Sequence, residues 1–304
     1  MRVLVTGANG FVGRHLCAHL GAQGDEVIPA CGPGAESAGA TMDVTDADSL
    51  RSAVAAARPE VVIHLAGFSS VAKSHADPAL AFSVNTLGAV HLLAAVRDIV
   101  PWARVLLIGS GEMYGKLVPA RAATEDLPLR PLSPYASSKV AAEAAGFQFQ
   151  RGTGLQVIAL RPFNHIGPGQ DAHFVVPSFA RRIVALRHGG HPGVLKTGDL
   201  SPVRDFLHVS DVVAAYRIVA VRGEAGEAYN VSSGQGRTIG SLLDEMLRLS
   251  GVEARIEVDP SLLRSVELPS AIGDSAKLRR LGWSPSRTVT DALREALEEA
   301  ASQP

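Results

Sequence analysis

Three polar residues near the middle of the chain have the types and spacing needed to move a proton to or from a carbonyl group. Tyr135 and Lys139 are four residues apart on a helix predicted at 133–150, so their side chains lie on one face. An unperturbed tyrosine has a pKa of about 10, and a nearby ammonium group is expected to lower it by stabilising the phenolate. Ser110 follows a predicted apolar strand at 104–108, and in a parallel sheet ligands bind at the carboxyl ends of the strands. We therefore expect Ser110 to hydrogen-bond a carbonyl oxygen and Tyr135 to protonate it.

A glycine-rich loop near the N-terminus predicts a site for a dinucleotide. Gly7, Gly10 and Gly13 stand in the run TGANGFVG, between a strand predicted at 2–6 and a helix at 11–23. One glycine allows the turn, one lets the backbone approach a pyrophosphate, and one packs helix on strand. The pyrophosphate then meets free N–H groups at the positive end of the helix. The spacing is G-x-x-G-x-x-G rather than the G-x-G-x-x-G of simple dehydrogenases.

The end of the second predicted strand (26–30) indicates which dinucleotide is bound. An acidic residue there usually hydrogen-bonds the ribose hydroxyls of NAD, but positions 30–33 read Ala-Cys-Gly-Pro. Nothing at these positions repels a 2′-phosphate, and Arg14 could contact it, so we expect NADPH, with NADH as the alternative. Asp43 and Val44 are candidates for the edge of the adenine ring; the alternative is that Asp43 only caps the following turn.

Strand and helix patterns alternate along the first half of the chain. Strands are predicted at 2–6, 26–30, 61–66, 104–108 and 155–160, and helices at 11–23, 46–57, 78–98 and 133–150. This alternation predicts an α/β fold with a Rossmann-type, doubly wound parallel sheet. We expect residues 1–161 to form an NAD(P)-binding domain, to which 204–231 return. Residues 162–203 and 232–304 should then form a smaller α/β lobe for the substrate.

The composition excludes several classes of function. The 304 residues suffice for about two domains. Lys and Arg number 29 against 30 Asp and Glu, so no basic field favours nucleic acid. Cys17 and Cys31 are too few for a disulfide framework or a thiolate zinc site, and His15 and His19 have no acidic cluster nearby, so no metal site is expected. No signal peptide and no apolar run of about 18 residues is evident, which predicts a cytoplasmic protein.

Five motifs together resemble the extended short-chain dehydrogenase/reductase family, in its nucleotide-sugar branch. They are TGANGFVG, HLAG at 64–67, SVNTLG around Asn85, SGEMYG at 110–115 and YASSK at 135–139. The resemblance implies that Ser110, Tyr135 and Lys139 form a catalytic triad and that Asn85 supports the active-site helix; as an alternative, Asn85 only bonds the backbone. It also implies cofactor contacts from Gly7, Asn9, Gly10, Phe11, Val12, Gly13, Asp43, Val44, Leu65, Ala66, Gly67, Tyr135, Lys139 and Pro162.

Motifs in the second half resemble a narrower group, the GDP-4-dehydro-6-deoxy-D-mannose reductases. They are RPFNHIGPGQ at 161–170, GDLSPVRDFLHVSDVVAAY at 198–216 and LRSVELPSAIGDSAKLRRLGW at 263–283. The resemblance implies substrate contacts from Ser70, Asn164, Arg204, Arg264 and Glu267. Ser265 stands where this group usually has proline. The alternative for Arg204 is a local ion pair with Asp205 at a strand end.

Glu112 and the residue before it help to distinguish reductases from dehydratases in this family. In the related 4,6-dehydratases a glutamate at this position removes the C5 proton, but the reductases carry it as well, so Glu112 is a catalytic candidate in both. The dTDP-sugar dehydratases place an aspartate before it, where this chain has Gly111. The resemblance therefore favours an NAD(P)H-dependent reduction of the C4 ketone of a nucleotide-linked 4-keto-6-deoxy sugar, with GDP-4-dehydro-6-deoxy-D-mannose giving GDP-D-rhamnose.

Other functions stay open at the level of sequence. A 4-epimerase or 4,6-dehydratase could use the same scaffold, and a non-catalytic NADP-sensing module would typically lack the tyrosine that this chain has at 135. No short motif encodes guanine, so dTDP- and UDP-linked sugars are alternatives. Family members commonly dimerise through helices at 88–98 and 134–150, so a homodimer is expected, with neither nucleic acid nor membrane as partner.

Overall fold

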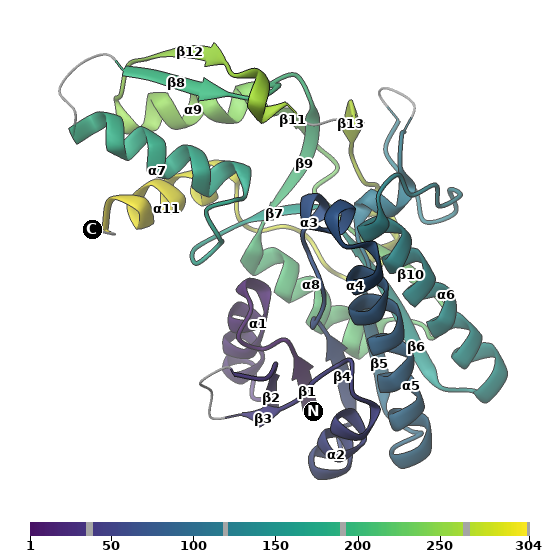
Figure 1. Ribbon diagram of the computed structural model, residues 1–304. Coiled ribbons are helices and arrows are strands. Elements are labelled where there is room, and N and C mark those ends of the chain that lie inside the picture. The colour runs from purple at the N-terminus through teal and green to yellow at the C-terminus, as the bar shows by residue number, and fades with distance from the viewer. Residues whose placement is uncertain (35–38, 118–120, 189–192, 264–267, 303–304) are drawn as a thin grey trace.

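A seven-stranded parallel sheet forms the centre of the computed structural model, which describes residues 1–34, 39–117, 121–188, 193–263 and 268–302 (Figure 1). Its strand order is β10-β6-β5-β4-β1-β2-β3. The strands are β1 (Arg2–Thr6), β2 (Glu26–Cys31), β3 (Ala40–Thr41), β4 (Val61–His64), β5 (Arg104–Ile108), β6 (Gln156–Pro162) and β10 (Ala228–Val231). Every neighbouring pair in this sheet runs parallel, which confirms the predicted α/β fold class.

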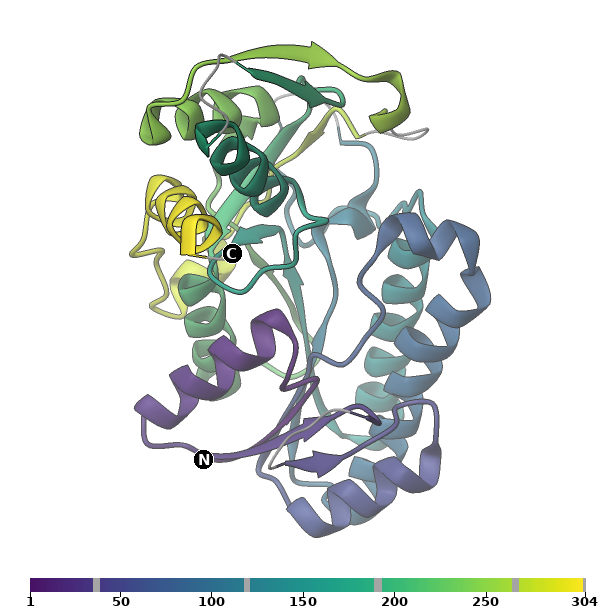
Figure 2. The same ribbon diagram turned by 60° about the vertical axis from the view of Figure 1, so that its left-hand side comes forward.

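Helices cover both faces of this sheet (Figures 1 and 2). One face is covered by α1 (Phe11–Ala22) and α8 (Val209–Arg222), and the other by α2 (Ala47–Ala57), α5 (Gly88–Ile99) and α6 (Pro134–Thr153). Side chains alternate between the two faces because the strand period is two residues.

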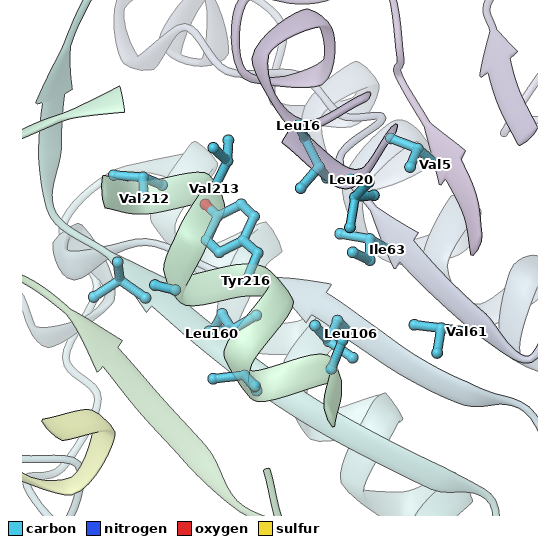
Figure 3. Close-up of a cluster of buried hydrophobic side chains, with 14 of the residues drawn as sticks. Val5, Leu16, Leu20, Val61, Ile63, Leu106, Leu160, Val212, Val213 and Tyr216 are labelled. Atoms are coloured by element: carbon cyan, nitrogen blue, oxygen red, sulfur yellow. The ribbon is translucent and has the colours of Figure 1, made fainter. Parts of the chain in front are cut away.

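Strand β1 shows how this alternation builds the two cores. Val3 and Val5 join the α1/α8 core, in which Tyr216 packs beside Leu160 (Figure 3). Leu4 joins the α2/α5/α6 core. The middle of β1 is therefore apolar on both faces, as the doubly wound arrangement requires.

The second half of the chain adds a smaller lobe above the carboxyl ends of the large sheet (Figure 1). Its four-stranded sheet contains β7 (Asn164–Ile166), β9 (Val203–His208), β11 (Gly236–Thr238) and β13 (Ser270–Ala271), and a separate parallel pair joins β8 (Gly193–Thr197) to β12 (Ala254–Val258). Helices α7 (Val175–His188), α9 (Ile239–Ser250) and α11 (Val289–Ser302) pack together on a third apolar core.

The segment 204–231 divides between the two sheets. Strand β9 pairs with β7, β11 and β13 in the smaller sheet. Helix α8 then crosses to the large sheet, and β10 pairs with its edge strand β6. The chain therefore passes from one lobe to the other between β9 and α8.

One long apolar helix contradicts the expectation that the chain has no apolar run of about 18 residues. The run α4 (Pro78–Phe82), η1 (Ser83–Leu87) and α5 is long and apolar enough, by length and composition alone, to cross a membrane, so the statement that no such stretch exists is wrong. In the fold, 44% of its apolar window is buried, and α5 packs between α2 and α6. These contacts are typical of a core helix.

Candidate active site

The glycine loop between β1 and α1 is packed so closely that side chains do not fit. Gly7 has φ +68°, a left-handed conformation that favours glycine. A Cβ at Gly13 would lie 2.2 Å from the carbonyl oxygen of Gly7, and one at Gly7 would lie 2.7 Å from the nitrogen of Ala66. The loop is closed by a 3.0 Å hydrogen bond from the Gly10 nitrogen to the Gly7 oxygen. The backbone itself therefore forms the surface that the predicted pyrophosphate would approach.

The first turn of α1 completes this cradle. Helix α1 begins at Phe11, after Gly10, and among the described residues no side chain caps its N-terminus. Its first N–H groups and its positive end are thus left for an anion. Arg14 lies beside the loop, where its guanidinium donates to the oxygens of Asn9 at 2.8 Å and Gly169 at 3.1 Å. The residues present fit a dinucleotide pyrophosphate.

Asp43 follows β3 at the position considered for adenine. Its Oδ1 accepts hydrogen bonds from the nitrogen of Thr45 at 2.9 Å and from its hydroxyl at 2.7 Å. These bonds lower the pKa of Asp43. The structure thus shows the turn-capping interaction of Asp43, while its contact with adenine stays a prediction. Val44 is buried and packs beside Gly88.

Leu65, Ala66 and Gly67 connect the glycine loop to the catalytic helix. The nitrogen of Ala66 donates to Thr6 Oγ1 at 3.0 Å, which fixes this segment to the end of β1. A Cβ at Gly67 would lie 3.2 Å from Lys139 Nζ. The segment therefore lies between the predicted pyrophosphate site and the predicted catalytic residues.

Ser110 and Tyr135 meet at the carboxyl end of β5. Ser110 caps the short helix η2 (Gly111–Tyr114), where its Oγ accepts from the nitrogen of Glu112 at 3.2 Å. Tyr135 lies in the first turn of α6, which begins with Pro134 and is capped by Ser133. A side-chain hydrogen bond joins Ser110 to Tyr135. The structure thus brings together the two groups expected to handle one carbonyl oxygen.

The pKa of Tyr135 differs from the expectation. Burial, the negative charge of Glu112 and the opposing hydrogen bond from Ser110 together raise it to about 12. The expected lowering by Lys139 is therefore wrong for the residues as the structure places them. Lys139 Nζ donates instead to the carbonyl oxygen of Ile108 at 2.9 Å, and burial lowers its pKa to about 8.

Asn85 supports α6 from a helical bulge. It lies in η1, a π-helical turn of the kind often found at functional sites. Its Oδ1 accepts from the nitrogen of Phe68 at 2.8 Å, and its Nδ2 donates to Ser138 Oγ at 2.9 Å. Ser138 in turn donates to the carbonyl oxygen of Tyr135 at 2.7 Å. Asn85 thus contacts both the backbone and the active-site helix.

A buried network behind the site was not predicted. Arg161, in β6, forms a two-pronged ion pair with Glu143 of α6 at 2.6 and 2.9 Å. It also donates to the hydroxyl of Tyr114 at 2.8 Å, which donates to Asn230 Oδ1 at 2.7 Å. The network joins α6, β6, η2 and β10. A charged residue directly after the strand predicted at 155–160 was the only signal in the sequence.

A second unpredicted pair lies under the loop at 65–67. His64 ends β4 and is buried, and its Nδ1 lies 2.8 Å from Thr6 Oγ1. Burial, together with the charge of Lys139, lowers the pKa of His64 to about 3. The low pKa keeps the imidazole neutral at neutral pH, and Nδ1 shares one hydrogen bond with Thr6 Oγ1, which also accepts from the nitrogen of Ala66.

A pocket of about 240 Å³ lies in the smaller lobe and contains two of the predicted substrate residues. Asn164, the first residue of β7, and Arg204, in β9, both line it. Arg204 Nη1 donates to the carbonyl oxygen of Leu268 at 2.7 Å. The predicted contacts Arg264 and Glu267 lie outside the described residues.

Asp205 and Ser70 have local partners. Asp205 is fully buried, and its carboxylate accepts from Ser233, Gly234 and Gly273, which ties β9 to two neighbouring loops. Ser70 caps α3 (Val71–Ala76), where its Oγ accepts from the nitrogen of Lys73 at 3.2 Å. A substrate contact from Ser70 stays a prediction.

The described residues contain no group of three His, Cys, Asp or Glu side chains that could hold a metal ion. His15 lies 2.8 Å from the carbonyl oxygen of Pro168, and Phe11 stacks on His165 with ring centroids 5.9 Å apart. His15 and His165 therefore link α1 to β7 and the loop that follows β7.

The glycine cradle, the parallel sheet and the Ser110–Tyr135 pair define an NAD(P)-dependent oxidoreductase of the Rossmann type. The model of the GDP-mannose 4,6-dehydratase family matches residues 4–296, so the chain belongs to this family, within the extended short-chain dehydrogenase/reductases.

Individual relatives span nearly the whole chain. It is 38% identical to the GDP-6-deoxy-D-mannose reductase of Pseudomonas aeruginosa, over 99% of this chain and 98% of the relative. The solved structure of RMD from Pseudomonas aeruginosa with NADPH matches with a TM-score of 0.87 and 37% identity, covering 99% and 97% of the two chains. The UDP-glucose 4-epimerase of Thermus thermophilus with NAD matches with a TM-score of 0.90 and 31% identity, covering 99% of each.

Proposed function

We propose that this enzyme reduces the C4 ketone of GDP-4-dehydro-6-deoxy-D-mannose to give GDP-D-rhamnose, with NADPH as the reductant. The observation that carries the proposal is the Ser110–Tyr135 hydrogen bond at the carboxyl end of β5, with Lys139 on the same helix. The 38% identity to the GDP-6-deoxy-D-mannose reductase of Pseudomonas aeruginosa supports the substrate. The NADPH complex of the related RMD, at 37% identity, supports the cofactor.

Each catalytic side chain has one task in this reaction. The nicotinamide supplies the hydride. Ser110 hydrogen-bonds the ketone oxygen and positions it. Tyr135, whose pKa of about 12 keeps it protonated at neutral pH, donates its proton as alkoxide character develops. Lys139 orients the cofactor ribose, and Glu112 keeps the proton on Tyr135 through its negative charge.

The cofactor contacts are proposed from the cradle. Gly7, Gly10 and Gly13 let the backbone reach the pyrophosphate, with Asn9, Phe11 and Val12 in the same turn. Leu65, Ala66, Gly67 and Pro162 would flank the nicotinamide half, and Asp43 and Val44 the adenine half. Arg14, beside Asn9, is placed to contact a 2′-phosphate.

The packing at Gly111 favours reduction over dehydration. A Cβ at this position would lie 2.8 Å from the ring of Phe163. An acidic side chain, which would help to expel the C6 hydroxyl in a dehydratase, therefore has no room there. Glu112 alone does not supply both groups that dehydration needs.

The substrate is proposed to lie across the two lobes. Residues 1–161, with α8 and β10 of the segment 204–231, would hold the cofactor, and 162–203 with β9 and 232–304 the nucleotide. Asn164 and Arg204 line one pocket, and a guanidinium suits diphosphate oxygens because it forms charge-assisted hydrogen bonds. Arg264, Glu267 and Ser70 are proposed as further contacts.

A homodimer in the cytoplasm is proposed as the working state. The helical run at 78–99 exposes large apolar side chains, with Leu80 43%, Phe82 38% and Leu87 52% exposed, and Leu132 before α6 is 49% exposed. A second copy of the chain would cover these side chains.

The test follows NADPH oxidation at 340 nm with GDP-4-dehydro-6-deoxy-D-mannose made in situ by a dehydratase. Wild type should consume NADPH and Tyr135→Phe should not. Tyr229→Phe should behave as wild type because Tyr229 lies in β10, where its hydroxyl accepts from the nitrogen of Glu224 and from no catalytic residue that the structure describes. No oxidation with GDP-, dTDP- or UDP-linked 4-keto sugars would contradict the proposal. Tightly bound NAD with C4 epimerisation, or loss of water from GDP-mannose, would then support the epimerase or dehydratase.

A further inference from the structure

The pocket in the smaller lobe is lined by both apolar and polar side chains, and Arg182, Thr197 and Asp199 are among the polar ones. Val175, Phe179, Leu200, Pro202, Phe206 and Ile239 supply apolar atoms around it. Its volume of about 240 Å³ is below the roughly 300–1,000 Å³ of pockets that enclose a whole small ligand. The pocket therefore suits a flat ring system rather than an entire sugar nucleotide.

Asp199 is the carboxylate in this wall. It lies in the loop between β8 and β9 and is exposed. Its Oδ1 accepts from the nitrogen of Ser201 at 2.8 Å, which fixes the direction of the side chain and lowers its pKa. The side chain of Ser201 also donates to this carboxylate. A carboxylate has about four acceptor positions, so these two bonds leave it able to accept from a ligand. Its negative charge disfavours a diphosphate beside it, so the base is the end of a nucleotide that suits this carboxylate, while Arg204 in the same pocket suits the diphosphate.

Thr197 is an independent sign that a polar ligand enters the same pocket. It ends β8, lines the pocket and is 1% exposed, and among the described residues its hydroxyl has no hydrogen-bond partner. A buried hydroxyl without a partner is unfavourable. A bound ring with polar edge atoms would remove this cost.

We propose that Asp199 makes the pocket selective for guanine, by accepting from the N1–H and the 2-amino group of the base. Guanine is the nucleobase that presents these two donors side by side, and a carboxylate accepts both. Uracil and thymine present one N–H between two carbonyl oxygens, which the carboxylate repels. Adenine and cytosine present one amino group beside a bare ring nitrogen. The proposal rests on the proposed function, since it takes the nucleotide sugar as the ligand of this pocket.

Calorimetry with free nucleotides tests the proposal without turnover. Full-length wild type should bind GDP about 10- to 100-fold more tightly than UDP or IDP, because IDP lacks the 2-amino group and hydrogen bonds to a charged group have this strength. Asp199→Asn should weaken GDP binding about 10-fold or more and bring GDP and IDP close together.

Two further variants separate base selection from a structural effect. Asp259→Asn is the matched control, because Asp259 makes the same turn bond to Ser261 at 2.9 Å but does not line this pocket; it should leave the GDP preference intact. Thr197→Val should weaken GDP binding without lowering Tm, since the hydroxyl has no partner to lose in the part of the chain that the structure describes.

Each result bears on one proposal. Equal binding of GDP and UDP by wild type, an unchanged GDP/IDP ratio in Asp199→Asn, or an equal loss in Asp259→Asn would overturn the role of Asp199 even if NADPH oxidation occurs. Asp199-dependent GDP binding without NADPH oxidation would uphold this role and contradict the reductase.

Discussion

The ring of Phe163 packs against the backbone of Gly111, so that a Cβ at position 111 would lie 2.8 Å from ring atom Cδ1. Gly273 meets another edge of the same ring, where a Cβ would lie 2.4 Å from Cε2. Phe163 is itself buried. One aromatic ring thus limits the side-chain size at two positions, one of them between Ser110 and Glu112.

Gly111→Ala should lower both stability and activity. Inserting a methyl group into a closed packing site costs about 1–3 kcal/mol, and the resulting shift of η2 would displace Ser110. Urea unfolding and NADPH oxidation measure the two effects. Adding Phe163→Leu should recover part of the stability, because it removes the atoms that collide. Gly21→Ala is the control, since a Cβ there meets nothing within 4 Å; an equal loss in that variant would contradict the packing argument.

Glu143→Ala should strongly destabilise the protein. It leaves the guanidinium of Arg161 buried without its carboxylate, a loss of about 3–5 kcal/mol for buried ion pairs. Replacing both residues by methionine should cost less than this single change. Asp98→Ala breaks the surface pair with Arg51 and should have little effect. Denaturant midpoints measure the stabilities of the three variants. A double methionine variant that is less stable than Glu143→Ala would contradict the predicted order.

The large sheet and the glycine loop were predictable because their signals are local. Alternating strand and helix patterns reflect burial of each strand on both faces, as in β1. The three glycines lie within seven residues, and the close approaches of Gly10 and Gly13 are to Gly7 and Ala8 in the same loop, whereas Gly7 itself packs against Ala66. The pairing of Ser110 with Tyr135 also followed from topology, since both lie at the carboxyl end of one sheet.

Features that depend on distant partners were not predictable. Tyr114 and Asn230 are 116 residues apart, and nothing near either of them shows that they share a hydrogen bond. The pKa of Tyr135 was expected to fall because the spacing places Lys139 on the same face, whereas burial and Glu112 raise it. Burial of an individual side chain cannot be read from helical spacing. The hydrogen bond from Thr45 to Asp43 is local, but a contact between Asp43 and adenine depends on how the cofactor binds.

Lys139→Met should abolish activity yet increase stability at neutral pH. Burial lowers the pKa of Lys139 from 10.5 to about 8 in the folded protein, so the buried ammonium is unfavourable. Between about pH 8 and 10.5 the unfolded state binds more protons, so the stability of wild type should rise with pH in this window, and the variant should lack this rise. Tm at pH 7 and 9.5 measures both effects. A lower Tm of the variant at pH 7 would contradict the argument.

His64→Asn should make the protein more resistant to mild acid. Burial lowers the pKa of His64 from 6.5 to about 3. Below pH 6.5 the unfolded state therefore takes up a proton that the folded state does not, and stability falls by up to about 1.4 kcal/mol per pH unit. The amide oxygen of asparagine can still accept from Thr6. Urea unfolding between pH 6.5 and 4.5 should show a shallower loss in this variant, whereas His75→Asn, at an exposed position, should follow wild type. An unchanged slope in His64→Asn would mean that His64 binds a proton as readily in the folded as in the unfolded state, which would contradict its low pKa.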